Sequence, residues 1–342
     1  MRRVLLFAPM SLRRFILPYR WLLLLALLTG IDVAHAQQYE ETVKKHSWFS
    51  FSRPAKKDPV AQLNYAQDLF ETGNLKKAGK AFRALVMTWP GSLEAPKAQW
   101  ALATTLDRRG KSIDAFDAYQ ALMENYPGRF PQYDQILARQ FEIATNLMFT
   151  RKGQFLFMPG FEAPERAIPL LEKIVQNGPR SPHAAEAQFL IGQAYEQSFD
   201  EELAVVAYMA TLHRYPLSRF AEPAAYGRAR ALHTISKNYP HDVQALEEAW
   251  TAVMVFLRAY PDSTYVADAT AMRDQILLRR ADQAFSIAYF YDRKAKRPDA
   301  ARESYELFLA QYPKSPRSDE ARERIAQLPA KKEPVNDETE KQ

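Results

Sequence analysis

Apolar residues recur three and four positions apart in two successive stretches that end at Pro90. These residues are Tyr65, Ala66 and Leu69 in the first stretch and Ala78, Phe82 and Leu85 in the second. Such spacing places one apolar stripe on each of two α-helices. Gly73 and Asn74 lie between the stretches and indicate a turn. The pattern therefore predicts a helix-turn-helix repeat whose two helices bury their apolar faces against each other.

The same arrangement returns along the chain. In the repeat that ends at Pro127, the apolar and turn positions are Leu102, Ala103, Leu106, Gly110, Ala115, Tyr119 and Leu122. In the repeat that ends at Pro216, they are Ile191, Gly192, Tyr195, Ala204 and Tyr208. Looser repeats end at Pro179, Pro261 and Pro313, and their second helices carry Ala167, Leu171 and Ile174, then Ala249, Val253 and Phe256, then Ala301, Tyr305 and Phe308.

A short phrase, aromatic-Pro-x-Ser, closes most of these repeats. Full copies begin at Trp89, Tyr215, Tyr260 and Tyr312, and the six repeat-closing prolines are 37, 52, 37, 45 and 52 residues apart. Proline cannot continue a helix and serine is a frequent N-cap, so each phrase is expected to end one helix and to cap the next. A period of about 34 residues or somewhat more is typical of tetratricopeptide repeats. The sequence predicts an all-α, tetratricopeptide-repeat superhelical solenoid of about five to six helix-turn-helix repeats.

The ends of the chain differ from the repeats in composition. Residues 1–36 have the layout of a cleavable signal peptide, in which Arg13, Arg14 and Arg20 precede an apolar run from Trp21 to Leu28 and small residues follow. That run is far shorter than the roughly 20 residues that cross a bilayer, which argues against a membrane anchor. The start is either Met1 or Met10. The expected parts are a signal peptide (1–36), a flexible linker (37–58), the solenoid (59–329) and a disordered charged tail (330–342).

One interruption of the repeats stands out between residues 149 and 163. It includes residues 153–161, where three phenylalanines and a methionine lie among helix breakers. Such a loop either folds back over the solenoid or presents an adaptable apolar surface to a partner. We favour folding back, because an exposed patch of this kind promotes aggregation.

Charge and composition narrow the function. The net charge of +6 falls to about +2 without the five arginines and one aspartate of residues 1–36, so nucleic-acid binding is not expected. The absence of cysteine excludes disulfides, thiolate metal sites, cysteine nucleophiles and a direct lipid anchor within these residues. The six histidines are scattered, and no zinc, nucleophile or phosphate-binding motif is present. We therefore expect no enzyme, no catalytic residue, no metal and no cofactor.

Protein binding is the function that such repeats favour. The first helix of each repeat lines a groove at positions three or four residues apart. The candidate groove residues are Leu63, Gln67 and Phe70 in the first repeat, Trp100, Thr104 and Arg108 in the second, and Phe189, Gln193 and Glu196 in the fourth. Trp100 and Phe189 either anchor an extended peptide or fill the core between repeats, and the sequence leaves both interpretations open.

A more specific pattern begins at Tyr260. The stretch Tyr260-Pro-Asp-Ser-Thr-Tyr-Val-Ala-Asp-Ala runs into Leu277-Leu278-Arg279-Arg280-Ala281-Asp282 and then Ala288-Tyr289-Phe290-Tyr291. It resembles the family of the outer-membrane assembly lipoprotein BamD, in which a Tyr-Pro-x-Ser-x-Tyr-x-x-Asp-Ala segment leads into one long helix that ends in an aromatic pair. The similarity covers about residues 60–328 and is clearest from Trp250 onward.

The resemblance implies a scaffold or adaptor that binds partner proteins in outer-membrane β-barrel assembly. Its partners would be a barrel-assembly subunit and unfolded barrel proteins, and it would lie in the periplasm, associated with the outer membrane through a partner. Family members carry a lipidated cysteine at the mature N-terminus, where this chain has Ala36-Gln37. The alternative function is a general cell-envelope repeat adaptor in the cell-wall or division machinery.

Overall fold

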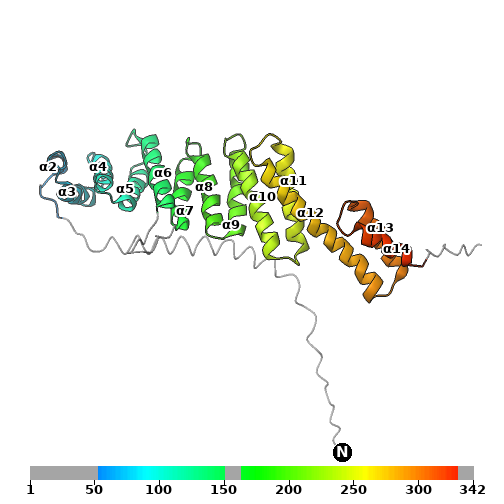
Figure 1. Cartoon of the computed structure of the whole chain (residues 1–342). Helices are drawn as coiled ribbons and strands as arrows, with labels where there is room; N and C mark the ends of the chain where they lie inside the picture. Colours follow the sequence, from blue (N-terminus) through cyan, green and yellow to red (C-terminus); the bar gives the residue numbers. More distant parts are fainter. Residues whose placement is uncertain (1–52, 151–162, 330–342) are drawn as a thin grey trace, which may run out of the picture. The chain divides into compact units, whose positions relative to one another are not determined.

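The computed structural model describes residues 53–150 and 163–329, and the elements in these ranges are all helical (Figure 1). They comprise 13 α-helices, one 3₁₀ turn and one π-helical turn, with no strand in the described ranges. The predicted all-α tetratricopeptide-repeat fold is thereby confirmed. The predicted signal peptide, the Phe-rich loop at 153–161 and the charged tail lie outside the described residues.

The chain divides into two compact parts, an N-terminal part (residues 1–122) and a C-terminal part (residues 123–342). The N-terminal part holds the helix pairs α2 (Pro59–Glu71) with α3 (Leu75–Thr88) and α4 (Ala95–Arg108) with α5 (Ser112–Asn125), the last of which runs across the boundary. Helix α2 begins after Asp58, whose carboxylate accepts a hydrogen bond from the Ala61 backbone N–H at 2.9 Å. Each pair turns at a glycine in the left-handed region, Gly73 at φ 77° and Gly110 at φ 71°.

The C-terminal part is a longer succession of helices. These elements are α6 (Tyr133–Phe149), η1 (Pro164–Ala167), α7 (Ile168–Asn177), α8 (Ala184–Gln197), α9 (Glu201–Arg214), α10 (Ala221–Asn238), α11 (Val243–Ala259), α12 (Val266–Tyr289), η2 (Phe290–Lys294), α13 (Pro298–Gln311) and α14 (Ser318–Gln327). From α6 onward each α-helix packs against the next along the chain. Helix α10 reaches 18 residues.

Buried glutamines connect the first helix of a pair to the second. The side-chain amides of Gln62, Gln99 and Gln188 donate to the carbonyl oxygens of Ala81, Ala118 and Ala207, at 3.0, 2.7 and 3.5 Å. Each glutamine lies 19 residues before its acceptor and 28 residues before the proline that closes its repeat. The three most regular repeats therefore share one buried hydrogen bond as well as one apolar pattern.

Each full copy of the aromatic-Pro-x-Ser phrase forms the same turn. The aromatic N–H donates to the carbonyl four residues earlier, and the serine N–H donates back to the aromatic carbonyl. The prediction that the serine caps the next helix is wrong, because the N-cap residues are Glu94, Phe220, Tyr265 and Arg317. The serine hydroxyl instead accepts a backbone N–H two or three residues ahead, within the turn that the chain completes before the helix starts.

Helix α12 contributes to two separate hydrophobic clusters. Its first half, including Met272 and Ile276, packs in a cluster with Phe256 of α11, and its second half brings Phe285 to a cluster with Phe308 of α13. Between the clusters, Leu277 and Leu278 are 38% and 49% exposed. At 1.5 Å per residue, this 24-residue helix is about 36 Å long.

The π-helical turn η2 follows α12 and is held by a buried carboxylate. Asp292 accepts hydrogen bonds from Nε and Nη2 of Arg324 in α14, both at 2.8 Å, and from the Tyr305 hydroxyl at 3.3 Å. The hydrogen bonds from Arg324 lower the pKa of Asp292 below its ordinary value. The last two α-helices are thus joined to η2 by a charge-assisted network.

Candidate functional site

In the N-terminal part, the structure brings together two of the predicted groove residues. The guanidinium of Arg108 in α4 lies over the ring of Phe70 in α2, 4.5 Å from its centroid. Phe70 also makes an edge contact with Phe82 at 6.4 Å, so its ring is half-buried. Gln67 on the same helix is exposed, whereas Leu63 is buried and contributes to packing. This surface therefore offers a cation held flat against an aromatic ring.

Trp100 lies in α4 and contacts the second helix of its own repeat. Its ring is half-buried and meets the ring of Tyr119 edge to face, with centroids 5.8 Å apart. The Thr104 hydroxyl donates a hydrogen bond to the Trp100 carbonyl at 3.1 Å, so its proton is bound to the backbone of its own helix. Trp100 therefore packs against the second helix of its pair while part of its ring stays accessible.

In the C-terminal part, the ring of Tyr208 in α9 packs against a glycine of each of two neighbouring helices. A Cβ placed on Gly192 of α8 or on Gly227 of α10 would lie 2.6 Å from the Tyr208 ring. These two glycines leave the space that the ring fills. Tyr208 is completely buried, and its hydroxyl donates a hydrogen bond to Glu196. The aromatic side chain thereby carries a polar group from the second helix of one repeat to the first-helix side.

That hydroxyl belongs to a charged group of side chains, which we call the Glu196 cluster (Glu196, Tyr208, Tyr226 and Arg230). The Tyr208 hydroxyl donates to Oε2 of Glu196 at 2.7 Å, and Arg230 of α10 donates to both carboxylate oxygens at 2.5 and 2.8 Å. Burial, and then Glu196, raise the pKa of Tyr208, so the phenol stays protonated. The hydrogen bond from Arg230 to Glu196 raises the pKa of that guanidinium. The Arg230 side chain is nevertheless 45% exposed and can meet a partner.

Phe189 lies beside this cluster and is held by two rings. Its ring centroid is 5.8 Å from that of Tyr208 and 5.7 Å from that of Phe220, which it stacks against. The guanidinium of Arg219 covers the Phe220 ring at 4.8 Å. Phe189 and Gln193 are both half-buried, so this part of α8 presents apolar and polar surface side by side.

The structure adds residues that the sequence analysis missed. Tyr226 stacks on Tyr265 at 4.3 Å with their planes 7° apart, and its hydroxyl donates to Asp268 of α12 at 3.4 Å. The Glu196 cluster therefore continues from α8 through α10 to α12. Arg230 follows Glu196 by 34 residues, one repeat period, and counting one period from a predicted groove position would have found it.

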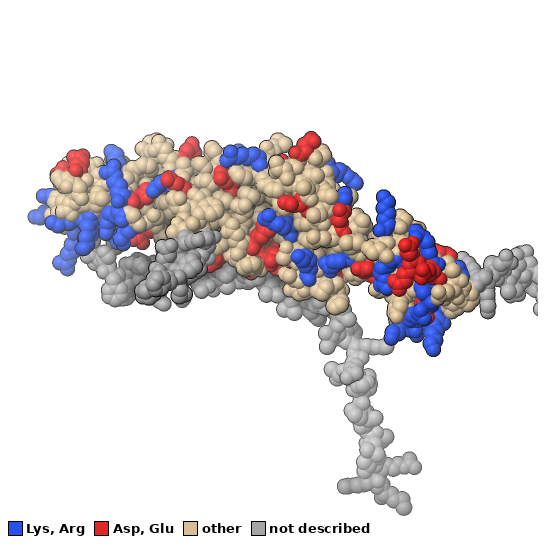
Figure 2. All heavy atoms as spheres, in the orientation of Figure 1, with Lys and Arg blue, Asp and Glu red and all other residues tan. Residues whose placement is uncertain are grey.

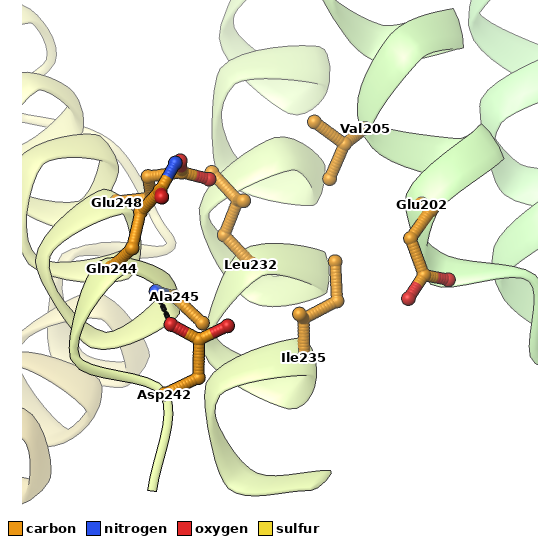
Figure 3. A pocket seen from close by; sticks show the side chains of 8 residues that line it. All are labelled: Glu202, Val205, Leu232, Ile235, Asp242, Gln244, Ala245 and Glu248. Carbon is orange, nitrogen blue, oxygen red and sulfur yellow. Dashed lines mark hydrogen bonds between the residues drawn. The ribbon is translucent and has the colours of Figure 1, made fainter. Parts of the chain in front are cut away.

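A groove of about 330 Å³ opens elsewhere in the C-terminal part, between α9 and α11 (Figure 3). It is lined by Glu202, Val205, Leu232, Ile235, Asp242, Gln244, Ala245 and Glu248. The Asp242 carboxylate accepts a hydrogen bond from the Ala245 N–H at 3.1 Å, and the Glu248 carboxylate accepts one from the Gln244 side-chain amide at 2.7 Å. Two carboxylates that line the groove therefore form hydrogen bonds within the first turns of α11. None of the predicted groove residues lines this space.

The described helices suit the binding of other proteins. In residues 53–150 and 163–329, no group of three His, Cys, Asp or Glu side chains could hold a metal ion. Across the same ranges, no helix is both long and apolar enough to cross a bilayer. Helix pairs, buried glutamines and exposed first-helix side chains together define a tetratricopeptide-repeat protein of the protein-binding type.

Comparison with known families identifies the chain further. The model of the YfiO family, described as "Outer membrane lipoprotein", matches residues 162–335, just over half of the chain. The protein belongs to this family, and the resemblance to BamD is confirmed. The matched span contains the whole Glu196 cluster. A search of curated protein sequences gives no match.

Several solved repeat structures are similar to the chain. YrrB, a TPR protein described as having an unusual peptide-binding site, is 14% identical, and the match covers 63% of this chain and 92% of YrrB with a TM-score of 0.30. The C-terminal part of a TPR protein from Cytophaga hutchinsonii is 16% identical over 86% of this chain and 96% of that one, with a TM-score of 0.30. For Pseudomonas aeruginosa PilF the identity is 13%, the coverages 78% and 96%, and the TM-score 0.27.

Proposed function

We propose that this protein is a periplasmic adaptor that binds partner proteins in the assembly of outer-membrane β-barrel proteins. The partners are a barrel-assembly subunit and unfolded barrel proteins, and the protein associates with the outer membrane through such a partner. Membership of the YfiO family is the observation that supports this proposal most directly.

The Glu196 cluster is the surface that we assign to partner binding. It lies within the family match, and it combines a half-exposed guanidinium with the stacked rings of Tyr226 and Tyr265. Arginine is among the residue types that most often dominate binding energy at protein interfaces, and Arg230 is the exposed member of the cluster. Because Glu196 and Tyr208 fix the guanidinium in place, little conformational entropy is lost when a partner binds Arg230.

Affinity capture from envelope extracts tests the proposal, with tagged full-length chain as bait and the captured proteins identified by mass spectrometry. We expect a barrel-assembly subunit among them. With Arg230→Ala we expect at least roughly tenfold less of that subunit, the loss typical of an interface hot spot. Arg258→Ala is the matched control, since Arg258 is an exposed arginine of α11 outside the cluster.

A thermal melt of each variant separates binding from folding. If Arg230→Ala unfolds at a lower temperature than the original protein, capture is repeated with Arg230→Lys. That variant keeps the positive charge and loses only the bidentate pairing with Glu196. Capture of cell-wall or division proteins without any barrel-assembly component would contradict the proposal and favour the general envelope adaptor.

A further inference from the structure

Helix α3 of the N-terminal part has an unusual charge distribution. Its 14 residues include four cations and no carboxylate. Lys76, Lys80 and Arg83 stand at i, i+4 and i+7, with Met87 at i+11, so they share one side of the helix, and Lys77 flanks them. We call Lys76, Lys77, Lys80 and Arg83 the α3 cationic stripe. Figure 2 shows lysine and arginine side chains gathered at the α2 and α3 end of the N-terminal part.

Among the residues that the structure describes, no acidic group pairs with the cations of the α3 cationic stripe. The three lysines are exposed, and none of the four side chains forms an ion pair with any residue in 53–150 or 163–329. Arg109 of α4 adds another cation beside them, because its Nη1 would lie 3.8 Å from a Cβ built on Gly79. By contrast, Lys111 pairs with Asp114 at 2.9 Å. Like charges at this spacing repel one another, and an anionic ligand would relieve that repulsion.

The form of the α3 cationic stripe indicates what kind of anion it fits. Its four cations form a row of about 10 Å from Lys76 to Arg83 along one side of the helix, which suits an extended anionic surface rather than a small ion. Met87 at its end and Leu93 in the next turn are 49% and 79% exposed, as at a membrane interface. The apolar side of α3 is occupied by the repeat core, with Phe82 and Leu85 buried, so the contact would be adsorption rather than insertion.

We propose that the α3 cationic stripe binds the anionic phospholipid surface of a bilayer. The description of the family, "Outer membrane lipoprotein", associates its members with a membrane. Electrostatic adsorption supplies a reversible contact of the same kind, which weakens as salt screens it. The inference goes beyond the proposed function, since it concerns another part of the chain and another class of ligand.

Vesicle co-sedimentation tests the inference, with the chain lacking residues 1–36 and phosphatidylcholine vesicles that do or do not contain phosphatidylglycerol. We expect binding only to the anionic vesicles, and less of it at high salt. Each lysine or arginine near an anionic surface contributes about fivefold, so Lys76→Gln, Lys80→Gln and Arg83→Gln together should weaken binding roughly a hundredfold.

A matched control carries Arg214→Gln, Arg258→Gln and Lys314→Gln, which remove the same charge from exposed positions of the C-terminal part. It should bind like the unchanged chain. Equal binding by the stripe variant, equal loss in the control, or binding insensitive to salt would overturn the inference. So would tighter binding to duplex DNA or polyglutamate than to the anionic vesicles at the same salt. The stripe variant should still capture the barrel-assembly subunit, so failure here and failure of the proposed function are distinguishable.

Discussion

Tyr208 depends on two residues that have no side chain. Its ring occupies the space beside Gly192 and Gly227, and its hydroxyl reaches Glu196 only because both glycines let the ring pass. A glycine inside a helix normally costs about 1 kcal/mol relative to alanine, so two of them at facing positions need a compensating contact. The buried ring and its hydrogen bond provide that contact.

We expect Gly192→Ala to destabilise the protein by about 2 kcal/mol. The new methyl group would overlap the Tyr208 ring, and overpacking of this kind outweighs the gain in helix propensity. Urea unfolding followed by circular dichroism measures the effect. Gly91→Ala is the control, because a Cβ there meets nothing within 4 Å. A Gly192→Ala protein as stable as the original would show that the ring can move aside.

Asp292 gives a pH-dependent prediction. Its pKa is lower in the folded protein than in the unfolded chain, so its contribution to stability is present above the unfolded value of about 4 and is lost as pH falls through the folded value. Asp292→Asn removes the charge from the hydrogen bonds with Arg324 and should cost about 2 kcal/mol at neutral pH. The difference from the original protein should shrink below about pH 4 in unfolding titrations. A difference that stays constant at acid pH would contradict this account.

At the scale of elements, the recurring glutamine bond is as regular as the apolar stripes. The buried side chain of Gln99 donates a hydrogen bond to the Ala118 carbonyl. Truncation to alanine would therefore create a cavity and leave that carbonyl without its partner. We expect Gln99→Ala to lower the free energy of unfolding by about 2 kcal/mol, measured with urea. Gln67→Ala, at an exposed position, should change it by less than about 0.5 kcal/mol. Equal effects of the two substitutions would show that the shared hydrogen bond does not stabilise the helix pair.

The spacing of apolar residues predicted these helices well, because a helix that buries one face needs apolar residues three or four positions apart. Phe82, Tyr119 and Phe256 are buried as their spacing indicates. The position of the serine was not predictable in the same way, since helix caps depend on how many residues the turn consumes before helical geometry resumes. The length of α10 was also missed, because a helical insertion has no proline or glycine to announce it.

The candidate site was only partly predictable, for a related reason. Glu196 and Phe189 were named as candidates from their positions within a repeat, and counting one period from Glu196 would also have named Arg230. The part played by the Tyr208 hydroxyl was not, because it depends on the separation of three helices at two glycines. Contacts across repeats are set by such distances, which a single repeat pattern does not contain.

At the scale of the whole molecule, the family match and the fold divide the chain differently. The match at residues 162–335 falls entirely within the C-terminal part and contains the Glu196 cluster, whereas the α3 cationic stripe lies outside it. The proposed protein contacts and the proposed lipid contacts therefore belong to different stretches of the sequence.

Helix α12 has a mechanical consequence. One continuous helix is embedded at one end among α10 and α11 and at the other among α13 and α14, with only partly covered leucines between. A straight helix resists twisting and bending over such a length, so a rotation imposed at one end must reappear at the other. A partner that displaced the last repeat would therefore act, through the continuous helix α12, on the cluster around Phe256.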